Sequence, residues 1–108
     1  MSIRDAVASL GNLEVSSNLR LTDYTDDSAT AGNRTVNRLR GKNSVASGAA
    51  SVTITNSLVT ANSMVLVTLE FVDATSVAKA CIPGAGSFVL TLVSAATLDT
   101  KFSWLVIN

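Results

Sequence analysis

KFSWLVIN, residues 101–108, alternates large apolar side chains with other residues and decides the fold. Phe102, Trp104 and Val106 occupy every second position, which is the period of a β-strand with one face toward a core. Leu105 and Ile107 fall on the opposite face and are also apolar. We therefore expect this strand to be covered on both faces, with a neighbouring subunit as the second cover.

The same alternation continues upstream. Phe88, Leu90 and Leu92 form a second inward row, which we expect to pack in the same core. Before them, Pro83-Gly84-Ala85-Gly86 is a turn sequence that predicts a hairpin. Further strands are predicted over residues 34–39, 52–55, 65–71 and 77–82. About six strands with no long helix between them predict an all-β fold, either an antiparallel β-sandwich or a jelly-roll-like barrel.

The N-terminal part has a different pattern. Ser2 and Gly11 are suitable ends for a short helix, whose apolar stripe includes Val7 and Leu10. Residues 12–33 show only two brief alternations and then a polar stretch, which is typical of an extended arm that orders on another surface; an ordinary surface loop is the alternative. The sequence thus predicts residues 1–44 as a helix and arm, and residues 45–108 as a β-sandwich knob.

The composition bounds the kind of partner. A chain of 108 residues has room for one domain, and 47% hydrophobic against 15% charged residues leaves little charge to coat it. We expect an oligomer; a monomer with a Ser- and Thr-rich surface is the alternative. Because the formal net charge is zero, nothing points to nucleic acid or an acidic membrane. No signal peptide or membrane anchor is visible, and a single cysteine favours folding in the cytoplasm.

Residues for chemistry are scarce. The chain has no histidine, the usual general base and a common metal ligand. Asp23, Asp26 and Asp27 lack the spacing of a calcium-binding loop, and Cys81 lies among apolar residues as a small hydrophobe would. We therefore expect no enzymatic activity, no cofactor and no bound metal.

A basic segment precedes the knob. Arg34, Arg38, Arg40 and Lys42 lie within nine residues, and three of the four could share one face of a strand. They either guard a strand edge against aggregation or pair with acidic loops of a neighbour or a shell protein. No aromatic residue is interleaved with them, which argues against nucleic-acid binding.

Three short motifs stand out in residues 45–108: Thr60-Ala61-Asn62-Ser63 before an apolar strand, Ser87-Phe88-Val89-Leu90-Thr91, and Phe102 to Asn108. In these motifs the chain resembles a β-module near the C-termini of bacteriophage structural proteins, including head fibres, spikes, capsid cement (decoration) proteins and tail-fibre tips. Such modules form compact trimers. The resemblance implies a trimeric decoration protein on the outer capsid surface that bridges capsomers by binding the major capsid protein. A fibre or tail tip that binds a host-surface receptor is the alternative.

This resemblance leads to two sets of expected contact residues. The expected trimer interface consists of Phe102, Trp104, Leu105 and Ile107. The expected capsid-docking residues are Val7, Leu10, Leu19, Leu21, Tyr24, Arg34, Arg38 and Arg40.

Overall fold

The computed structural model describes residues 24–70 and 76–108, which fold into β-strands with no helix among them. The strands are β1 (Tyr24–Asp26), β2 (Arg34–Thr35), β3 (Arg40–Val45), β4 (Ser51–Thr55), β5 (Met64–Leu69), β6 (Ala78–Gly84), β7 (Ser87–Leu92) and β8 (Thr100–Ile107). The prediction of an all-β fold is confirmed for these residues. The N-terminal helix and the arm up to residue 23 lie outside the described part of the chain.

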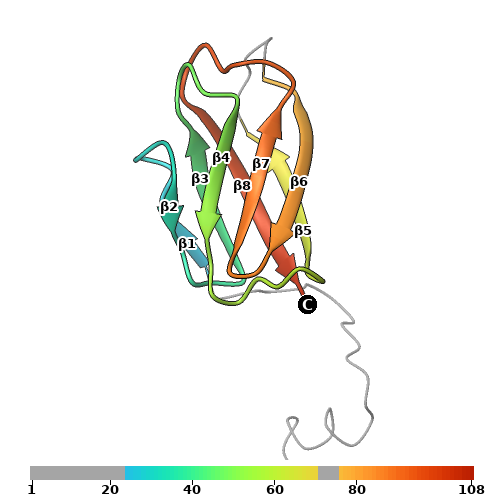
Figure 1. Cartoon of the computed structure of the whole chain (residues 1–108). Helices are drawn as coiled ribbons and strands as arrows, with labels where there is room; N and C mark the ends of the chain where they lie inside the picture. The colour runs from blue at the N-terminus through green and yellow to red at the C-terminus, as the bar shows by residue number, and fades with distance from the viewer. Residues whose placement is uncertain (1–23, 71–75) are drawn as a thin grey trace, which may run out of the picture.

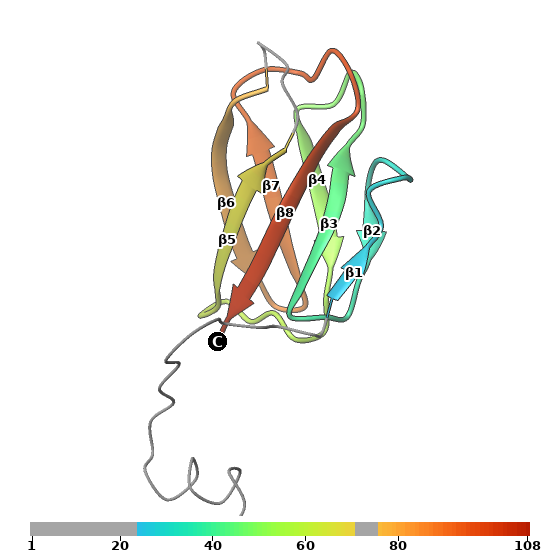
Figure 2. The same ribbon diagram turned by 180° about the vertical axis from the view of Figure 1, so that it is seen from behind.

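Two four-stranded sheets pack face to face as a β-sandwich (Figure 1). The first sheet has the strand order β1-β3-β8-β5, and the second has the order β2-β4-β7-β6. Figure 2 shows the first sheet from its outer side, with β8 running diagonally across it between β3 and β5. The C-terminal strand β8, with its row of Phe102, Trp104 and Val106, is therefore a central strand.

Both sheets are mixed, whereas the sequence predicted antiparallel pairing throughout. The central pairs are antiparallel, but β1 runs parallel to β3 and β2 runs parallel to β4. The cause is that the chain changes sheet after β1, after β2 and after β3. β1 therefore pairs with β3 in one sheet, and β2 pairs with β4 in the other. Alternation within a strand records which face is buried but not the direction of its neighbour.

One hydrophobic core lies between the sheets. Phe88 and Trp104 meet there edge to face, with ring centroids 5.2 Å apart, so the two predicted inward rows do share a core. Such aromatic pairs add about 1 kcal/mol beyond the area that they bury. The buried apolar residues are Val36, Val45, Val52, Ile54, Val59, Phe88, Leu90, Leu92, Ala96, Phe102, Trp104 and Val106.

The sandwich begins before residue 45, where the sequence placed the end of the arm. Residues 24–44 contain β1, β2 and most of β3, all of which pair within the two sheets. The strand predicted over residues 34–39 is instead the two-residue β2, after which the chain crosses to the other sheet. β3 cannot be recognised from a pattern of apolar residues, because its buried positions include Gly41, Asn43 and Ser44.

Backbone and side-chain hydrogen bonds connect the loops at the end of the sandwich where β8 ends. The predicted hairpin is confirmed: β6 and β7 pair from Gly84 and Ser87, and Gly86 between them has a φ of 80°. The backbone of Gly86 accepts a hydrogen bond from the N–H of Asn56 and donates one to Val59. The Asn108 side chain accepts a hydrogen bond from the Ser63 hydroxyl and so fixes the end of β8 to the turn before β5.

Candidate interaction surface

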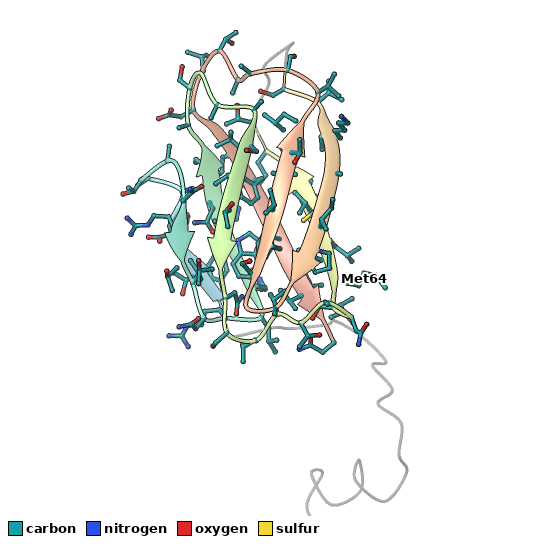
Figure 3. The ribbon with its side chains drawn as sticks, viewed as in Figure 1. Met64 is labelled. Carbon is teal, nitrogen blue, oxygen red and sulfur yellow. The ribbon has the colours of Figure 1, made fainter. Side chains whose placement is uncertain are left out.

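Four apolar side chains lie together on the outer face of the first sheet, where β5 starts and β8 ends. Met64 pairs with Ile107 and Leu66 with Leu105, and directly opposite residues in antiparallel strands share a face. Met64, Leu66 and Ile107 are 56%, 49% and 43% exposed, and Leu105 is half-buried. Figure 3 shows the Met64 side chain projecting away from the sandwich. We call these four residues the apolar patch.

The same face becomes charged farther along the strands. The Lys42 ammonium lies 3.0 Å from both carboxylate oxygens of Glu70, which also accepts a hydrogen bond from the Ser103 hydroxyl. Arg40, paired with Leu105 of the patch, places its guanidinium 4.4 Å from the ring centroid of Tyr24. This cation–π contact lies at the border between the patch and the charged residues.

The hydrogen bonds at the charged end shift both pKa values toward the ionised forms. The Ser103 hydroxyl and the Lys42 ammonium lower the pKa of Glu70 below its ordinary value of 4.5. The hydrogen bond to Glu70 raises the pKa of Lys42 above 10.5. Both groups are therefore charged at neutral pH, and this end of the face is polar, in contrast to the apolar patch.

The outer face of the second sheet is different. Its rows hold mainly Ser and Thr, with Ile82 and Val89 as the large apolar pair in the middle. Ile82 is 63% exposed and pairs with Val89 on β7, but Val89 pairs on its other side with Thr53 of β4, so the apolar surface ends after these two residues. Exposed apolar residues that occur singly or in pairs are ordinary in soluble proteins, whereas a contiguous group rimmed by polar residues indicates a contact site.

The expected trimer-interface residues separate into two pairs. Leu105 and Ile107 lie in the apolar patch. Phe102 and Trp104 are 0% and 3% exposed and belong to the core of this chain, so their side chains have no surface to offer a neighbour. The alternation along β8 causes this split, because successive side chains point to opposite faces of the sheet.

The expected capsid-docking residues do not form one cluster in the described part of the chain. Tyr24 and Arg40 lie on the outer face of the first sheet. Arg34 lies on β2 in the second sheet, where its guanidinium pairs with Asp27 at 2.9 Å, and Arg38 is exposed in the link between the sheets. The basic residues therefore do not share a face. The remaining four, Val7, Leu10, Leu19 and Leu21, lie outside the described residues.

Two hollows lie beside β1 and β2, with volumes of about 430 and 300 Å³. The larger is lined by Asn33, Arg34, Thr35 and Thr55, and the smaller by Thr25, Asp27, Thr35, Val36, Asn37 and Arg38. Both are open and mostly polar, unlike the enclosed apolar pockets that hold most cofactors. A sugar or a short polar segment would fit such a surface better than an apolar ligand.

The aspartates of β1 and the turn after it, and the single cysteine, are the side chains that could carry chemistry. Asp26 accepts hydrogen bonds from the backbone and the hydroxyl of Ser28, and Asp27 is paired with Arg34. Burial raises the pKa of the Cys81 thiol to about 11, so the thiolate is scarce at neutral pH. Over residues 24–70 and 76–108, no three acidic or cysteine side chains gather as metal ligands.

The same residues include no helix with the length and apolarity to cross a membrane.

Sequence reasoning found half of the apolar patch. It missed Met64 and Leu66 because the inward row of β5, with Val65, Val67 and Leu69, accounts for the strand's apolar character by itself. The signal was nonetheless present, since residues 64 and 66 form a second apolar row at the start of the same strand. Only the register between β5 and β8 shows that the two rows are neighbours.

No protein-family model, no curated protein and no solved structure matches this chain.

Proposed function

We propose that this protein is a structural, non-enzymatic subunit of a bacteriophage particle, a homotrimeric decoration protein on the outer surface of the capsid. The protein is made in the host cytoplasm. It binds the major capsid protein, bridges capsomers and so stabilises the head. It needs no cofactor, and neither nucleic acid nor a membrane is a partner. The resemblance of residues 45–108 to phage β-modules supports this proposal.

The apolar patch is the observation that carries the proposal. Its three most exposed members would each remain about half exposed in an isolated subunit. Burying such side chains contributes roughly 25 cal/mol per Å² of apolar surface, which favours covering the patch with protein. Three copies that bring their patches together around an axis would remove them from water at once.

The connectivity supports the same class of protein. From β3 to β6 the chain alternates between the two sheets, and β8 returns to lie beside β3. This connectivity is similar to that of a jelly roll with fewer strands, an architecture common in viral capsid domains, and so supports the proposal. The charged end of the first sheet, where Lys42 and Glu70 form an ion pair, would then lie at the rim of the trimer, toward a capsid surface.

A mass measurement tests the trimer. Light scattering of the purified protein is expected to give three times the chain mass of 11.2 kDa. Leu105→Asp, which buries a charge in the patch, is expected to yield smaller species because an unpaired buried charge costs several kcal/mol. Ile82→Asp, at an exposed position on the opposite sheet, is the matched control and should remain trimeric. A trimer from Leu105→Asp contradicts the proposed interface.

Co-sedimentation with expanded, DNA-filled phage heads tests the location. The trimer is expected to bind at a fixed number of copies per head and to raise the temperature at which the heads release DNA. Failure of the intact trimer to bind such heads contradicts the decoration role.

The polar hollow beside β2 favours one alternative, a fibre or tail-tip protein that binds a receptor on the host surface. Its lining by Asn33, Arg34, Thr35 and Thr55 offers the amide, guanidinium and hydroxyl groups that sugar recognition uses. Under this alternative, labelled protein binds host cells, and Thr35→Arg, which fills the hollow, abolishes binding without changing the mass. Equal binding by the variant argues against it.

A further inference from the structure

The outer edge of β5, the side away from β8, differs from the other sheet edges. β1 and β2 are only three and two residues long, and β6 contains Pro83 and an irregular register around Lys79. Short strands, proline and bulges are the devices that prevent a sheet edge from pairing with another chain. β5 has six residues, Met-Val-Leu-Val-Thr-Leu, with none of these devices and no charge. We call the edge of β5 that points away from β8 the open edge.

The hydrogen-bonding pattern identifies the backbone groups at the open edge. The N–H of Glu70 donates to the carbonyl of Lys101 at 2.8 Å, which marks a hydrogen-bonded pair between the chain after β5 and β8. In an antiparallel ladder such pairs recur at every second residue, so Leu66 and Thr68 also direct their backbone groups to β8. Val65, Val67 and Leu69 direct theirs to the open edge, where no strand of the described residues pairs with them.

The side chains of these three residues are also incompletely covered. Val65, Val67 and Leu69 point toward the core but remain half-buried, whereas the inward residues of β8 are 0–4% exposed. One more strand along the open edge, with apolar side chains on its inner face, would cover them and satisfy the backbone groups together.

We propose that residues 12–16 of a neighbouring copy supply this strand. In Asn12-Leu13-Glu14-Val15-Ser16, Leu13 and Val15 alternate with polar residues, so an extended backbone would place both apolar side chains on one face. They match the spacing by two of the inward residues of β5. This proposal deepens the trimer proposed above and rests on it.

The length of the chain before β1 permits the exchange. Seven residues separate residue 16 from Tyr24 at the start of β1, and a chain extended over eight steps spans roughly 26 Å. The first sheet is only about 14 Å wide from β1 to β5, at about 4.8 Å between strands. The segment can therefore pass beyond the sheet of its own subunit.

The position of the open edge favours a neighbour over the segment's own subunit. Met64 and Leu66 belong both to β5 and to the apolar patch, so a subunit seated on the patch lies directly beside the edge. An exchanged strand is also a head-to-tail contact, and contacts of this type close rings such as trimers.

Disulfide trapping tests the exchange in the full-length chain. In a Cys81→Ser background, Val15→Cys is combined in turn with Val65→Cys, Val67→Cys or Leu69→Cys and oxidised. Cross-strand Cα atoms lie about 4.5–5.5 Å apart, within the reach of a disulfide. We expect at least one combination to give covalent species of two and three chain masses on a non-reducing gel. Val15→Cys with Thr53→Cys, on β4 of the other sheet, is the control and should stay single-chain.

Hydrogen exchange provides a second readout. Removing residues 1–21 is expected to speed exchange of the Val67 amide by about tenfold or more, while the Leu66 and Thr68 amides, which face β8, keep their protection.

The outcomes separate this inference from the proposed function. A disulfide within one chain, or none at any of the three positions, overturns the exchange, as does unchanged exchange at Val67 after the deletion. The mass of the unoxidised protein reports independently on the trimer, so a trimer without trapping refutes only the exchange.

Discussion

Trp104, on β8 of the first sheet, contacts residues of both sheets. Its ring packs edge to face on Phe88 of the second sheet, and its indole N–H donates to the buried Asn43 side chain at 2.8 Å. The ring also occupies the space above Gly41 of β3, where a Cβ atom would lie 2.8 Å from the ring. A glycine at position 41 is therefore needed to leave room for the indole ring.

Gly41→Ala is expected to destabilise the protein by about 1–3 kcal/mol, because the added methyl would also lie 2.8 Å from the Thr25 carbonyl and the well-packed ring cannot give way. Urea unfolding followed by tryptophan fluorescence measures the change. Gly84→Ala is the matched control: a Cβ there lies 3.8 Å from the nearest atom, so the change should stay within about 0.5 kcal/mol. Equal effects of the two substitutions would refute the steric argument.

The contact between Lys42 and Glu70 predicts a pH-dependent contribution to stability. The pKa of Glu70 is lowered, so its contribution is present above 4.5 and is lost as the pH falls through the folded-state pKa. The pKa of Lys42 is raised, so its contribution is present below 10.5 and is lost as the pH rises through the folded-state pKa. Unfolding of the wild type and Glu70→Gln should thus differ at neutral pH and converge in acid. A difference that persists unchanged in acid contradicts this account.

At the scale of elements, Asn56 holds three segments together. Its side chain donates to the Arg38 carbonyl at 2.6 Å and accepts from the Leu58 N–H at 3.0 Å, while its own N–H donates to Gly86. The link between β2 and β3, the turn after β4 and the β6–β7 hairpin thus meet at one fully buried residue.

Asn56→Ala is expected to cost about 1–3 kcal/mol, because it removes a fully buried side chain together with its hydrogen bonds to the Arg38 carbonyl and the Leu58 N–H. The free energy of unfolding in urea measures the loss. Asn37→Ala removes one bond to the Ser57 N–H at an exposed site, where water can replace the side chain, and should cost less. A larger loss from the Asn37 substitution would rule out burial as the cause.

The strands that alternate apolar and polar residues could be predicted from the sequence. β4, β5, β7 and β8 follow this pattern, and so the core of Phe88, Trp104 and their neighbours was found correctly. β3 was missed because Gly41 and Asn43 fill buried positions with little apolar character. The apolar patch was half predicted, since it depends on the register between two strands that are 30 residues or more apart in the chain.

At the scale of the whole molecule, an oligomer held by the apolar patch has a stability that depends on concentration. Because association stabilises only the folded state, the thermal midpoint should rise with protein concentration. Differential scanning calorimetry over a hundredfold concentration range is expected to show this rise for the wild type and Ile82→Asp but not for Leu66→Asp. A midpoint that is independent of concentration in all three would contradict assembly through this face.

The central position of β7 and β8 also sets the order in which the fold can form during translation. β8 lies between β3 and β5, and β7 lies between β4 and β6. A nascent chain that ends before Ser87 can form only the short parallel pairs of β1 with β3 and β2 with β4. Neither sheet can assemble until its late strand leaves the ribosome, so until then β5 stays unpaired and β4 pairs only with β2. Delay at that stage favours aggregation, because the apolar side chains of both strands are not yet covered.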